Sequence, residues 1–530
     1  MIKVDIRLPL EYSASDIIGA VCRVLPIDKD EIRDVMLLKR TLVISDKSDI
    51  HYTATVAFSA SDGRETGLLK MRKKVSYYEP FDTSVPQYRH STRPVVVGAG
   101  PAGLFCALAL AESGARPILY ERGLDIDTRD AKVSTFRLTG LLDPECNVQY
   151  GEGGAGTYSD GKLKVGGMDK YKMKVLSTFV ECGADDEILY SVGAHVGTDV
   201  LSGVIRRLRE RLISLGADIR FGARLTDIRL RDGAVVGGRV LVGHSYEDFE
   251  TDTLIVAAGH SARDTFELLY KSGAPMQSRG FGIGMRIEHP REYINEIVYG
   301  KNYPSALGTA SYHLVTHLPS GRSVYSFCMC PGGVVVPAAS EQGGIVTNGM
   351  SEHARMADNS NAALLVSVTP DDFGADDVFA GLRLQRAIEQ RAFTLAGADY
   401  SAPATSLSSL TDGTSPHLAS VKPSYARGTS LISHTDYFPD FVTDSIKAAM
   451  PDFDAWLPGY AYPDAALTGP ETRTTSPIRI LRDDRTLEVL GIDGLYAAGE
   501  GAGYSGGIVS SARDGLMIAE AAILKQSGHK

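Results

Sequence analysis

The sequence predicts an α/β protein of several domains, organised around a parallel sheet whose strands lie far apart along the chain. Three segments lead to this prediction. Residues 95–97 (VVV) form a short β-branched run before a glycine-rich turn, and two apolar runs end in similar turns at 253–259 (TLIVAAG) and 494–507 (GLYAAGEGAGYSGG). A chain of 530 residues is also too long for one simple core, so we expect two or three domains.

Composition and charge limit the classes of function. Hydrophobic residues make up 43% and charged residues 23% of the chain, and the formal charge of −10 gives no overall attraction to nucleic acid or anionic membranes. The N-terminus has no apolar signal region, and no run of 18 apolar residues predicts a membrane helix. Six scattered cysteines favour a reducing compartment. We therefore expect a cytoplasmic protein without a membrane partner.

Residues 1–88 are predicted to form a small α/β domain, with a ferredoxin-like layout as one interpretation. Residues 2–6 alternate as in a strand, residues 13–24 follow a helical pattern, and residues 51–58 (HYTATVAF) alternate again. Five basic residues are interpreted as a solvated face rather than a binding patch: Lys39, Arg40, Arg72, Lys73 and Lys74. Residues 79–94 contain three prolines and are interpreted as an extended linker.

The strand at 95–97 opens a dinucleotide-binding pattern of the Rossmann type. It is followed by Gly98, Gly100 and Gly103 in GxGxxG spacing, and then by a helical segment and a second apolar strand at 117–120. Gly98 is expected to form the tight turn, Gly100 to leave room for a pyrophosphate, and Gly103 to bring the helix close to the strand. The phosphates would then lie at the positive end of the helix dipole.

Glu121 ends the second strand, 18 residues after Gly103. An acidic side chain at this place accepts both hydroxyl groups of an adenosine ribose and repels a 2′-phosphate, although Arg122 follows directly. We expect Glu121→Ala to weaken dinucleotide binding without loss of the fold. Gly100→Val should abolish binding, because its side chain would occupy the space of the pyrophosphate.

Segments later in the chain are predicted to belong to the same dinucleotide-binding fold, although long insertions separate them in the sequence. Residues 149–162 (QYGEGGAGTYSDGK) form a glycine-rich loop that lacks the strand and helix of a second dinucleotide motif. Helical patterns are found at 200–215, 377–396 and 508–524.

These patterns divide the chain into domains. Short strands and loops dominate from about residue 261 to residue 470, whereas the segments on either side carry the Rossmann-type turns. We assign residues 89–265 and 470–530 to the dinucleotide-binding domain, and residues 266–469 to an inserted α+β substrate domain.

Several motifs together resemble a known family. They are VVVGAGPAG with LYERG, YGEGGAGTYSDGK, HVGTD, AAGHSARDTF, YSFCMCPGG, NGMS, ETRTTSPIRI and AAGEGAGYSGGI. Over nearly all of residues 90–530 they resemble the large NAD(P)/FAD-dependent dehydrogenases of the glutathione-reductase-like flavoprotein superfamily. The resemblance implies FAD as the cofactor and a Rossmann-like FAD-binding domain that is split by insertions.

The resemblance also implies where FAD would bind. The GxGxxG turn and Glu121 would hold the ADP half, the loop at 149–162 would lie near the flavin, and the turn at 499–500 would meet the ribityl chain and pyrophosphate. The helix that begins near residue 507 would point its positive end at the flavin. The full set expected to contact FAD is Gly98, Gly100, Pro101, Ala102, Gly103, Glu121, Arg122, Gly153, Gly154, Thr157, Ser159, Ala258, Gly259, Gly499, Glu500, Gly507 and Ile508.

Candidate catalytic residues follow from side-chain chemistry, and the catalytic base stays unassigned. Cys328 and Cys330 form a CxC pair, which either carries a redox-active disulfide or packs in a strand, while the lack of further ligands disfavours a metal site. His260 is a candidate proton carrier, against a structural role. Arg473, like Arg263 and Arg286, offers a planar fork for a substrate carboxylate or for an ordinary ion pair. Tyr504 lies in the last glycine-rich turn and offers stacking or a hydrogen bond.

The leading hypothesis is an FAD-dependent oxidoreductase that transfers hydride between an unknown organic substrate and the flavin. A flavin-linked thiol–disulfide exchange through Cys328 and Cys330 is one alternative. A flavoprotein associated with nucleic acid, of the tRNA-modifying type, is another that the negative charge disfavours, and a non-catalytic flavin-binding module is a third. Because a second dinucleotide motif is lacking, an NAD(P)H donor would have to dock transiently. The oligomeric state is left open.

Overall fold

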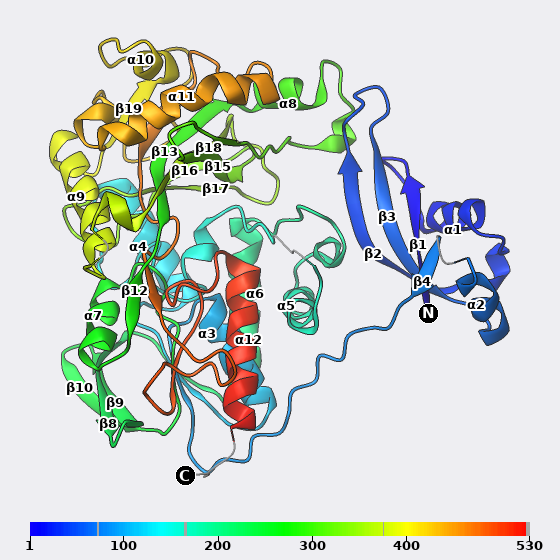
Figure 1. The fold of residues 1–530 in the computed structure, drawn as a ribbon, viewed down its shortest axis with the longest axis horizontal. Coiled ribbons are helices and arrows are strands. Elements are labelled where there is room, and N and C mark those ends of the chain that lie inside the picture. Colours follow the sequence, from blue (N-terminus) through cyan, green and yellow to red (C-terminus); the bar gives the residue numbers. More distant parts are fainter. Residues whose placement is uncertain (72–73, 164–166, 375, 526–530) are drawn as a thin grey trace.

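The computed structural model describes residues 1–71, 74–163, 167–374 and 376–525. In Figure 1 an N-terminal unit lies beside the rest of the chain, and an extended segment joins it to a parallel sheet covered by helices. A second sheet, from the middle of the chain, lies above that part. Within the described ranges no helix is both long and apolar enough to span a bilayer.

The N-terminal unit is a four-stranded antiparallel sheet with two helices. Its elements, in chain order, are β1 Ile2–Leu8, α1 Ala14–Val24, β2 Arg33–Val43, β3 His51–Ser59, α2 Asp62–Leu69 and β4 Val75–Tyr77. Their spatial order β2-β3-β1-β4 is the split βαβ arrangement. Helix α1 begins where it does because Ser13 and Asp16 form a capping box.

Strand β2 attaches this unit to the rest of the chain. The Arg40 N–H donates to the Tyr190 carbonyl at 2.6 Å, and its guanidinium pairs with Glu187 and donates to Ser191 at 3.0 Å. Arg40 is therefore a docking residue and not part of a solvated face, which corrects the interpretation of the sequence. Lys39 and Lys74 are exposed as expected, whereas Arg72 and Lys73 lie outside the described residues.

The central sheet is parallel and combines three distant parts of the sequence. Its strands, in spatial order, are β23 Leu495–Ala497, β11 Leu254–Val256, β5 Val95–Val97, β6 Ile118–Tyr120 and β7 Asp218–Arg220. Strands β5, β11 and β23 are fully buried, as expected for apolar strands covered on both faces. All five carboxyl ends meet at one edge, where open α/β sheets bind ligands.

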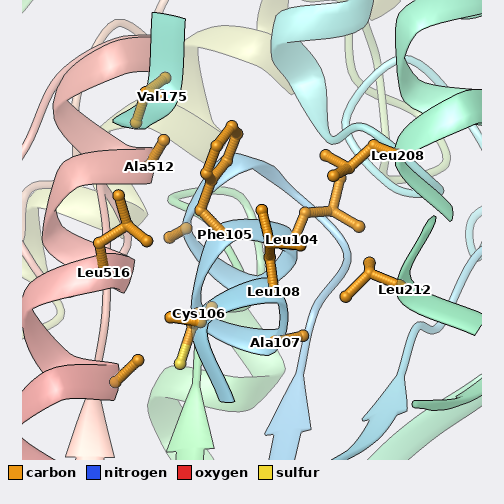
Figure 2. Packing of buried hydrophobic residues seen from close by; sticks show 14 of the residues in the cluster. Leu104, Phe105, Cys106, Ala107, Leu108, Val175, Leu208, Leu212, Ala512 and Leu516 are labelled. Atoms are coloured by element: carbon orange, nitrogen blue, oxygen red, sulfur yellow. The ribbon is translucent and has the colours of Figure 1, made fainter. Parts of the chain in front are cut away.

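Helix α3 (Pro101–Glu112) is the centre of the packing on this sheet. All its residues from 102 to 111 are buried, because α12 (Ile508–Leu524), α5 (Lys170–Glu181) and α6 (Thr198–Ser214) surround it. Figure 2 shows Phe105 directed toward Val175 and Ala512, and Leu104 toward Leu208. A Cβ at Gly515 would lie 2.0 Å from the Ala102 carbonyl oxygen, so only glycine lets α12 approach α3 this closely.

The middle of the chain forms a seven-stranded mixed sheet. Its strands, in spatial order, are β14 Val315–His317, β15 Ser323–Cys330, β18 Asn359–Val368, β13 Phe281–Pro290, β21 Ala466–Glu471, β19 Ala402–Ser406 and β20 Thr429–Ser430. Helices α9 (Ala380–Leu395) and α11 (Asp440–Trp456) contribute to its apolar core.

Three other small sheets and further helices complete the described part of the chain, beginning with the helices and the first two of these sheets. They are α4 Ile126–Thr139, α7 Arg263–Lys271, α8 Arg291–Tyr299 and α10 Leu407–Thr411, the meander β8 Ala223–Arg231, β9 Ala234–Val242 and β10 Ser245–Glu250, and the pair β16 Val334–Pro337 with β17 Thr347–Met350. A last pair, β12 Met276–Ser278 and β22 Ile478–Ile480, joins the two main parts of the chain.

The domain limits from the sequence need correction. The limit between residues 265 and 266 falls inside α7, and the limit between 469 and 470 falls inside β21. Because β21 pairs with β13 and β19, the whole of β21 belongs to the inserted sheet. The chain leaves the part that contains the parallel sheet through β12 and returns to it through β22, and these two strands form an antiparallel pair. Residues 279–477 therefore form the inserted part.

Several expected elements are confirmed and some were missed. The helices expected at 13–24, 200–215, 377–396 and 508–524 correspond to α1, α6, α9 and α12. Helices α4, α5 and α11 were not expected. Helix α4 has a charged, weakly periodic sequence with Arg129 fully buried, so it lacks the usual apolar pattern of a helix. Helix α11 has that pattern, but it contains Pro451, a residue that normally interrupts a helix.

Candidate functional site

A cleft lies at the carboxyl edge of the parallel sheet, and strands of the inserted sheet form its other wall. Its empty volume is about 1790 Å³ when the open solvent at the mouth is included. Most residues expected to contact FAD line it: Gly98, Gly100, Pro101, Ala102, Glu121, Arg122, Gly154, Ser159, Ala258, Gly259, Gly499, Glu500, Gly507 and Ile508. Of the catalytic candidates, the lining includes Cys328, Cys330, His260 and Arg473.

The turn between β5 and α3 forms a cradle at one end of the cleft. A Cβ at Gly98 would lie 2.4 Å from the Ala257 carbonyl oxygen, and one at Gly103 would lie 1.8 Å from the Gly98 carbonyl oxygen. A Cβ at Gly100 would meet only the Gly154 Cα, at 3.7 Å, and would otherwise enter the cleft. Gly98 and Gly103 therefore serve the fold, whereas Gly100 keeps space for a ligand beside the free N–H groups of the helix. These features fit a dinucleotide pyrophosphate.

Glu121 lines the cleft but already binds the backbone around it. Its carboxylate accepts N–H groups from Ala99 at 2.6 Å, Gly123 at 2.8 Å and Gly151 at 3.0 Å, and the residue is 5% exposed. These bonds join β6, the cradle and the glycine-rich loop. We therefore expect Glu121→Ala to destabilise the fold as well as to weaken dinucleotide binding, because three buried donors would lose their acceptor.

Arg122 forms part of the neighbouring wall. Its guanidinium donates to Asp264 at 2.7 Å and lies 4.5 Å from the centroid of the Tyr150 ring. The Asp264 carboxylate and the Tyr150 ring hold this guanidinium, so it gives this wall of the cleft a fixed, planar surface.

The loop at 149–162 covers the cradle. The Gly153 N–H donates to the Ala99 carbonyl at 2.8 Å, and a Cβ at Gly154 would lie 2.9 Å from the Gly100 Cα, so the two turns are in direct contact. Gly153 and Thr157 lie behind the wall, where Thr157 is fully buried and touches Gly153. Gly103 is likewise behind the wall, between α3 and β5.

The turn after β23 and the start of α12 form a third side of the cleft. The Gly499 N–H donates to Asp514 at 2.7 Å, and Arg482 holds that carboxylate from the other side. Burial raises the pKa of Glu500 to about 7, against the opposing effects of the Gly507 backbone and Arg279. The first turn of α12 offers N–H groups to the cleft, at the positive end of the helix dipole.

Tyr504 does not line the cleft, which corrects its place among the catalytic candidates. The Arg482 guanidinium lies 3.7 Å from the centroid of its ring, and Arg479 lies 5.1 Å away. The tyrosine therefore stacks against arginines on the far side of the turn.

Cys328 and Cys330 lie on the wall that the inserted sheet contributes. A bulge in β15 interrupts its pairing with β18 between Phe327 and Cys330, and Cys328 has a left-handed backbone with φ +40°. This conformation exposes Cys328 in the cleft, while Cys330 is 1% exposed. Both thiols are free, and the surrounding protein raises the pKa of Cys328 to about 12. Among the described residues, no group of three or more His, Cys, Asp or Glu is placed to hold a metal ion.

The arginine candidates bind carboxylates of the protein itself. Arg286 uses all its donors on Glu471, Cys328, Asn348 and Asn361. Arg263 and Arg473 both bind Glu389, which is 1% exposed. The ion-pair interpretation thus holds for all three, and Arg286 has no N–H left for a substrate.

His260 lines the cleft beside this cluster. Burial, with the nearby charges of Arg473 and Arg263, lowers the pKa of His260 to about 4. Its Nδ1 lies 3.0 Å from the Ser261 hydroxyl. The imidazole is therefore neutral at pH 7, and could accept a proton or donate a hydrogen bond but carries no charge.

Sequence reasoning missed several residues of the cleft. Asp160 and Lys162 follow Ser159 in the same loop, and Asn348 and Glu471 belong to β17 and β21. The first two could have been found, because they stand in the motif YGEGGAGTYSDGK. Asn348 and Glu471 also stand in motifs of the resemblance, but nothing local indicates that their strands meet at the cleft.

Comparison with known proteins gives the family. An uncharacterized protein of Clostridium beijerinckii (strain ATCC 51743 / NCIMB 8052) is 41% identical over 535 residues, which cover 98% of each chain. The two chains belong to one family. Residues 280–474 match the family model described as FAD-dependent protein, C-terminal domain-like. FAD is the cofactor, in agreement with the cradle and with the expectation from the sequence.

Similar solved structures were also found. A flavocytochrome c3 fumarate reductase is 14% identical with a TM-score of 0.35, covering 82% of this chain and 77% of its own. A geranylgeranyl bacteriochlorophyll reductase-like protein from Thermoplasma acidophilum is 12% identical with a TM-score of 0.37, covering 83% and 79%. Both scores are below 0.5, which is too low to support an inference about the activity of this chain.

Proposed function

We propose that the protein is an FAD-dependent dehydrogenase that transfers hydride between a small organic substrate and the flavin. The observation that carries this proposal is the composition of the cleft. One wall is a dinucleotide cradle, and the facing wall presents Lys162, Cys328 and Arg473 from the loop and the inserted sheet. The cleft thus joins a cofactor site to a substrate site whose wall carries charged and thiol side chains. Bound FAD supplies the hydride acceptor or donor.

The chain's own residues have distinct tasks in this proposal. The N–H groups at the start of α3 would bind the pyrophosphate, and Glu121, which holds the cradle in shape, would accept the ribose hydroxyl groups. Glu500 would bind the ribityl chain, and the positive end of α12 would stabilise negative charge on the flavin. We assign these parts to a Rossmann-like domain of the glutathione-reductase type, with the inserted sheet as substrate domain.

The test of the proposal begins with the cofactor. Purified protein should contain FAD at about one per chain, measured by absorbance after release, or should take it up on titration. Anaerobic mixing with families of alcohols, amines and carboxylic acids should then bleach the flavin with one class. Protein that neither contains nor binds FAD would contradict the proposal. Flavin that no donor reduces and no acceptor reoxidises would favour a non-catalytic module instead.

Exchange with a Cys328–Cys330 disulfide is the second candidate, favoured by the exposure of Cys328 in the cleft. The raised pKa of both thiols opposes it, because the thiolate is the reactive form. Replacing both cysteines by serine separates the candidates. Unchanged flavin reduction by the substrate would exclude the thiol route, whereas loss of reduction with full FAD occupancy would support it.

The remaining expectations on partners and location extend the proposal. We infer a cytoplasmic enzyme, since its six cysteines are free thiols. A nicotinamide donor would dock transiently at the mouth of the cleft. Nucleic acid is disfavoured as a partner by the formal charge of −10 and by the pairing of Arg40 with Glu187.

A further inference from the structure

Lys162 is a cation on the cleft wall without a carboxylate at hydrogen-bond distance among the described residues. Its Nζ donates to the Met329 carbonyl on β15, which ties the loop to the inserted sheet. The nearest carboxylate oxygen is Asp160 Oδ2, at 4.0 Å. Arg355 already holds that carboxylate with two N–H groups, one of them at 3.0 Å. The Lys162 side chain is only 19% exposed, and its ammonium has donors left over.

The other charges of this wall do not compensate Lys162. Arg286 and Glu471 form a closed pair. Three arginines share two carboxylates in the adjacent cluster, namely Arg263, Arg473 and Arg386 with Glu389 and Glu341. That cluster therefore has more positive than negative charge as well, and its Arg473 lies at the surface of the cleft.

A partly buried cation without a direct counter-ion is costly, and a site that retains one is complementary to an anion. We propose that Lys162 binds an anionic group of the substrate, a carboxylate or another oxoanion, in this cleft. The proposal rests on the proposed function and narrows its substrate to organic acids. Lys162 would donate charge-assisted hydrogen bonds that orient the acid against the cofactor side of the cleft.

Protonation of Lys162 gives this binding a pH dependence. Burial lowers the pKa of Lys162, Arg355 lowers it further, and Asp160, Cys330 and Cys328 oppose the shift. His195 lies on the segment that bridges to Lys162 and has a pKa lowered by burial, so it adds no charge at pH 7. Because only the ammonium binds an anion, affinity should fall as pH rises through this lowered pKa, below the value of 10.5 for an ordinary lysine.

The experiment is calorimetric titration of the full-length protein as purified, with its FAD content measured, using acetate, malonate and benzoate, each beside its neutral amide. Wild type should bind at least one acid more tightly than the matching amide. Lys162→Met should weaken that acid roughly 10- to 150-fold and leave the amide unchanged, whereas Lys162→Arg should retain most of the preference. Lys132→Met, at an exposed pair with Asp143, is the matched control and should behave as wild type.

Two results would overturn the inference. One is equal binding of acid and amide by wild type, or no binding of either. The other is unchanged acid affinity in Lys162→Met, with thermal unfolding confirming that the variant is folded. The heat signal does not depend on the flavin, so absence of FAD in the wild type would count against the proposed function alone.

Discussion

Gly100 and Gly103 offer a test that separates the cofactor site from the fold. Both belong to the GxGxxG turn, but an added methyl group meets different surroundings at each. At Gly103 the Cβ would overlap the Gly98 carbonyl oxygen at 1.8 Å, and this backbone atom is fixed between β5 and α3. At Gly100 the nearest atom is the Gly154 Cα at 3.7 Å, which is an ordinary contact.

The expected magnitudes follow from these distances. Gly103→Ala should lower the free energy of unfolding by about 1–3 kcal/mol or more, as overpacking does in other cores. Gly100→Ala should leave the free energy of unfolding of the FAD-free protein within about 1 kcal/mol of the wild-type value, because residue 100 has an extended backbone that alanine also adopts. Its methyl group should displace the pyrophosphate from the N–H groups of α3, which costs about 1.5–3 kcal/mol, or roughly 10- to 150-fold in the Kd for FAD.

The assay is denaturant unfolding of both FAD-free variants together with FAD titration followed by flavin fluorescence. Each variant is the control for the other, because they differ in position within one turn. Unchanged FAD affinity in Gly100→Ala would mean that the pyrophosphate does not lie on this turn. A destabilised Gly100→Ala would show that the space beside it belongs to the fold.

Three further predictions concern carboxylates. Glu121→Ala should lower the free energy of unfolding by at least about 1–3 kcal/mol, because buried N–H groups lose their acceptor. This is measured by denaturant unfolding of the FAD-free protein, and an unchanged free energy of unfolding would refute it. Burial opposes ionisation of Glu389, but Arg473 and Arg263 outweigh it and hold its pKa at about 2, so its stabilisation exists above pH 4.5 and is lost as pH falls toward 2. Glu389→Gln should cost about 3–5 kcal/mol at pH 7 and flatten this acid limb in thermal unfolding. The pKa of Glu500 is raised to about 7, so its contribution exists below pH 4.5 and is lost as pH rises through 7. Glu500→Gln without FAD should therefore be more stable than wild type at pH 8 and similar at pH 4, and equal curves would contradict this.

The dinucleotide cradle could be predicted from the sequence because it depends on consecutive residues, whereas FAD was predicted from the resemblance. A strand, a glycine turn, a helix and an acidic residue at the end of the next strand fix the direction of the N–H groups locally. Helix α12 could be predicted for the same reason, since its apolar pattern begins right after a glycine-rich turn. The role of Glu121 as an acceptor for three backbone N–H groups could not, because Gly151 lies 30 residues away.

The substrate wall was decided by tertiary structure. Cys328 faces the cleft because a bulge in β15 turns its backbone, and Tyr504 faces away because Arg482 holds its ring. Arg473 binds Glu389, which lies 84 residues away in the sequence, and Lys162 donates to a carbonyl of β15 that lies 167 residues away. By itself the sequence determined a dinucleotide site and the cradle that forms it, because backbone geometry over a few residues binds phosphate. Which charges stay paired and which face a substrate depends on contacts between distant strands, and a local pattern carries no information about them.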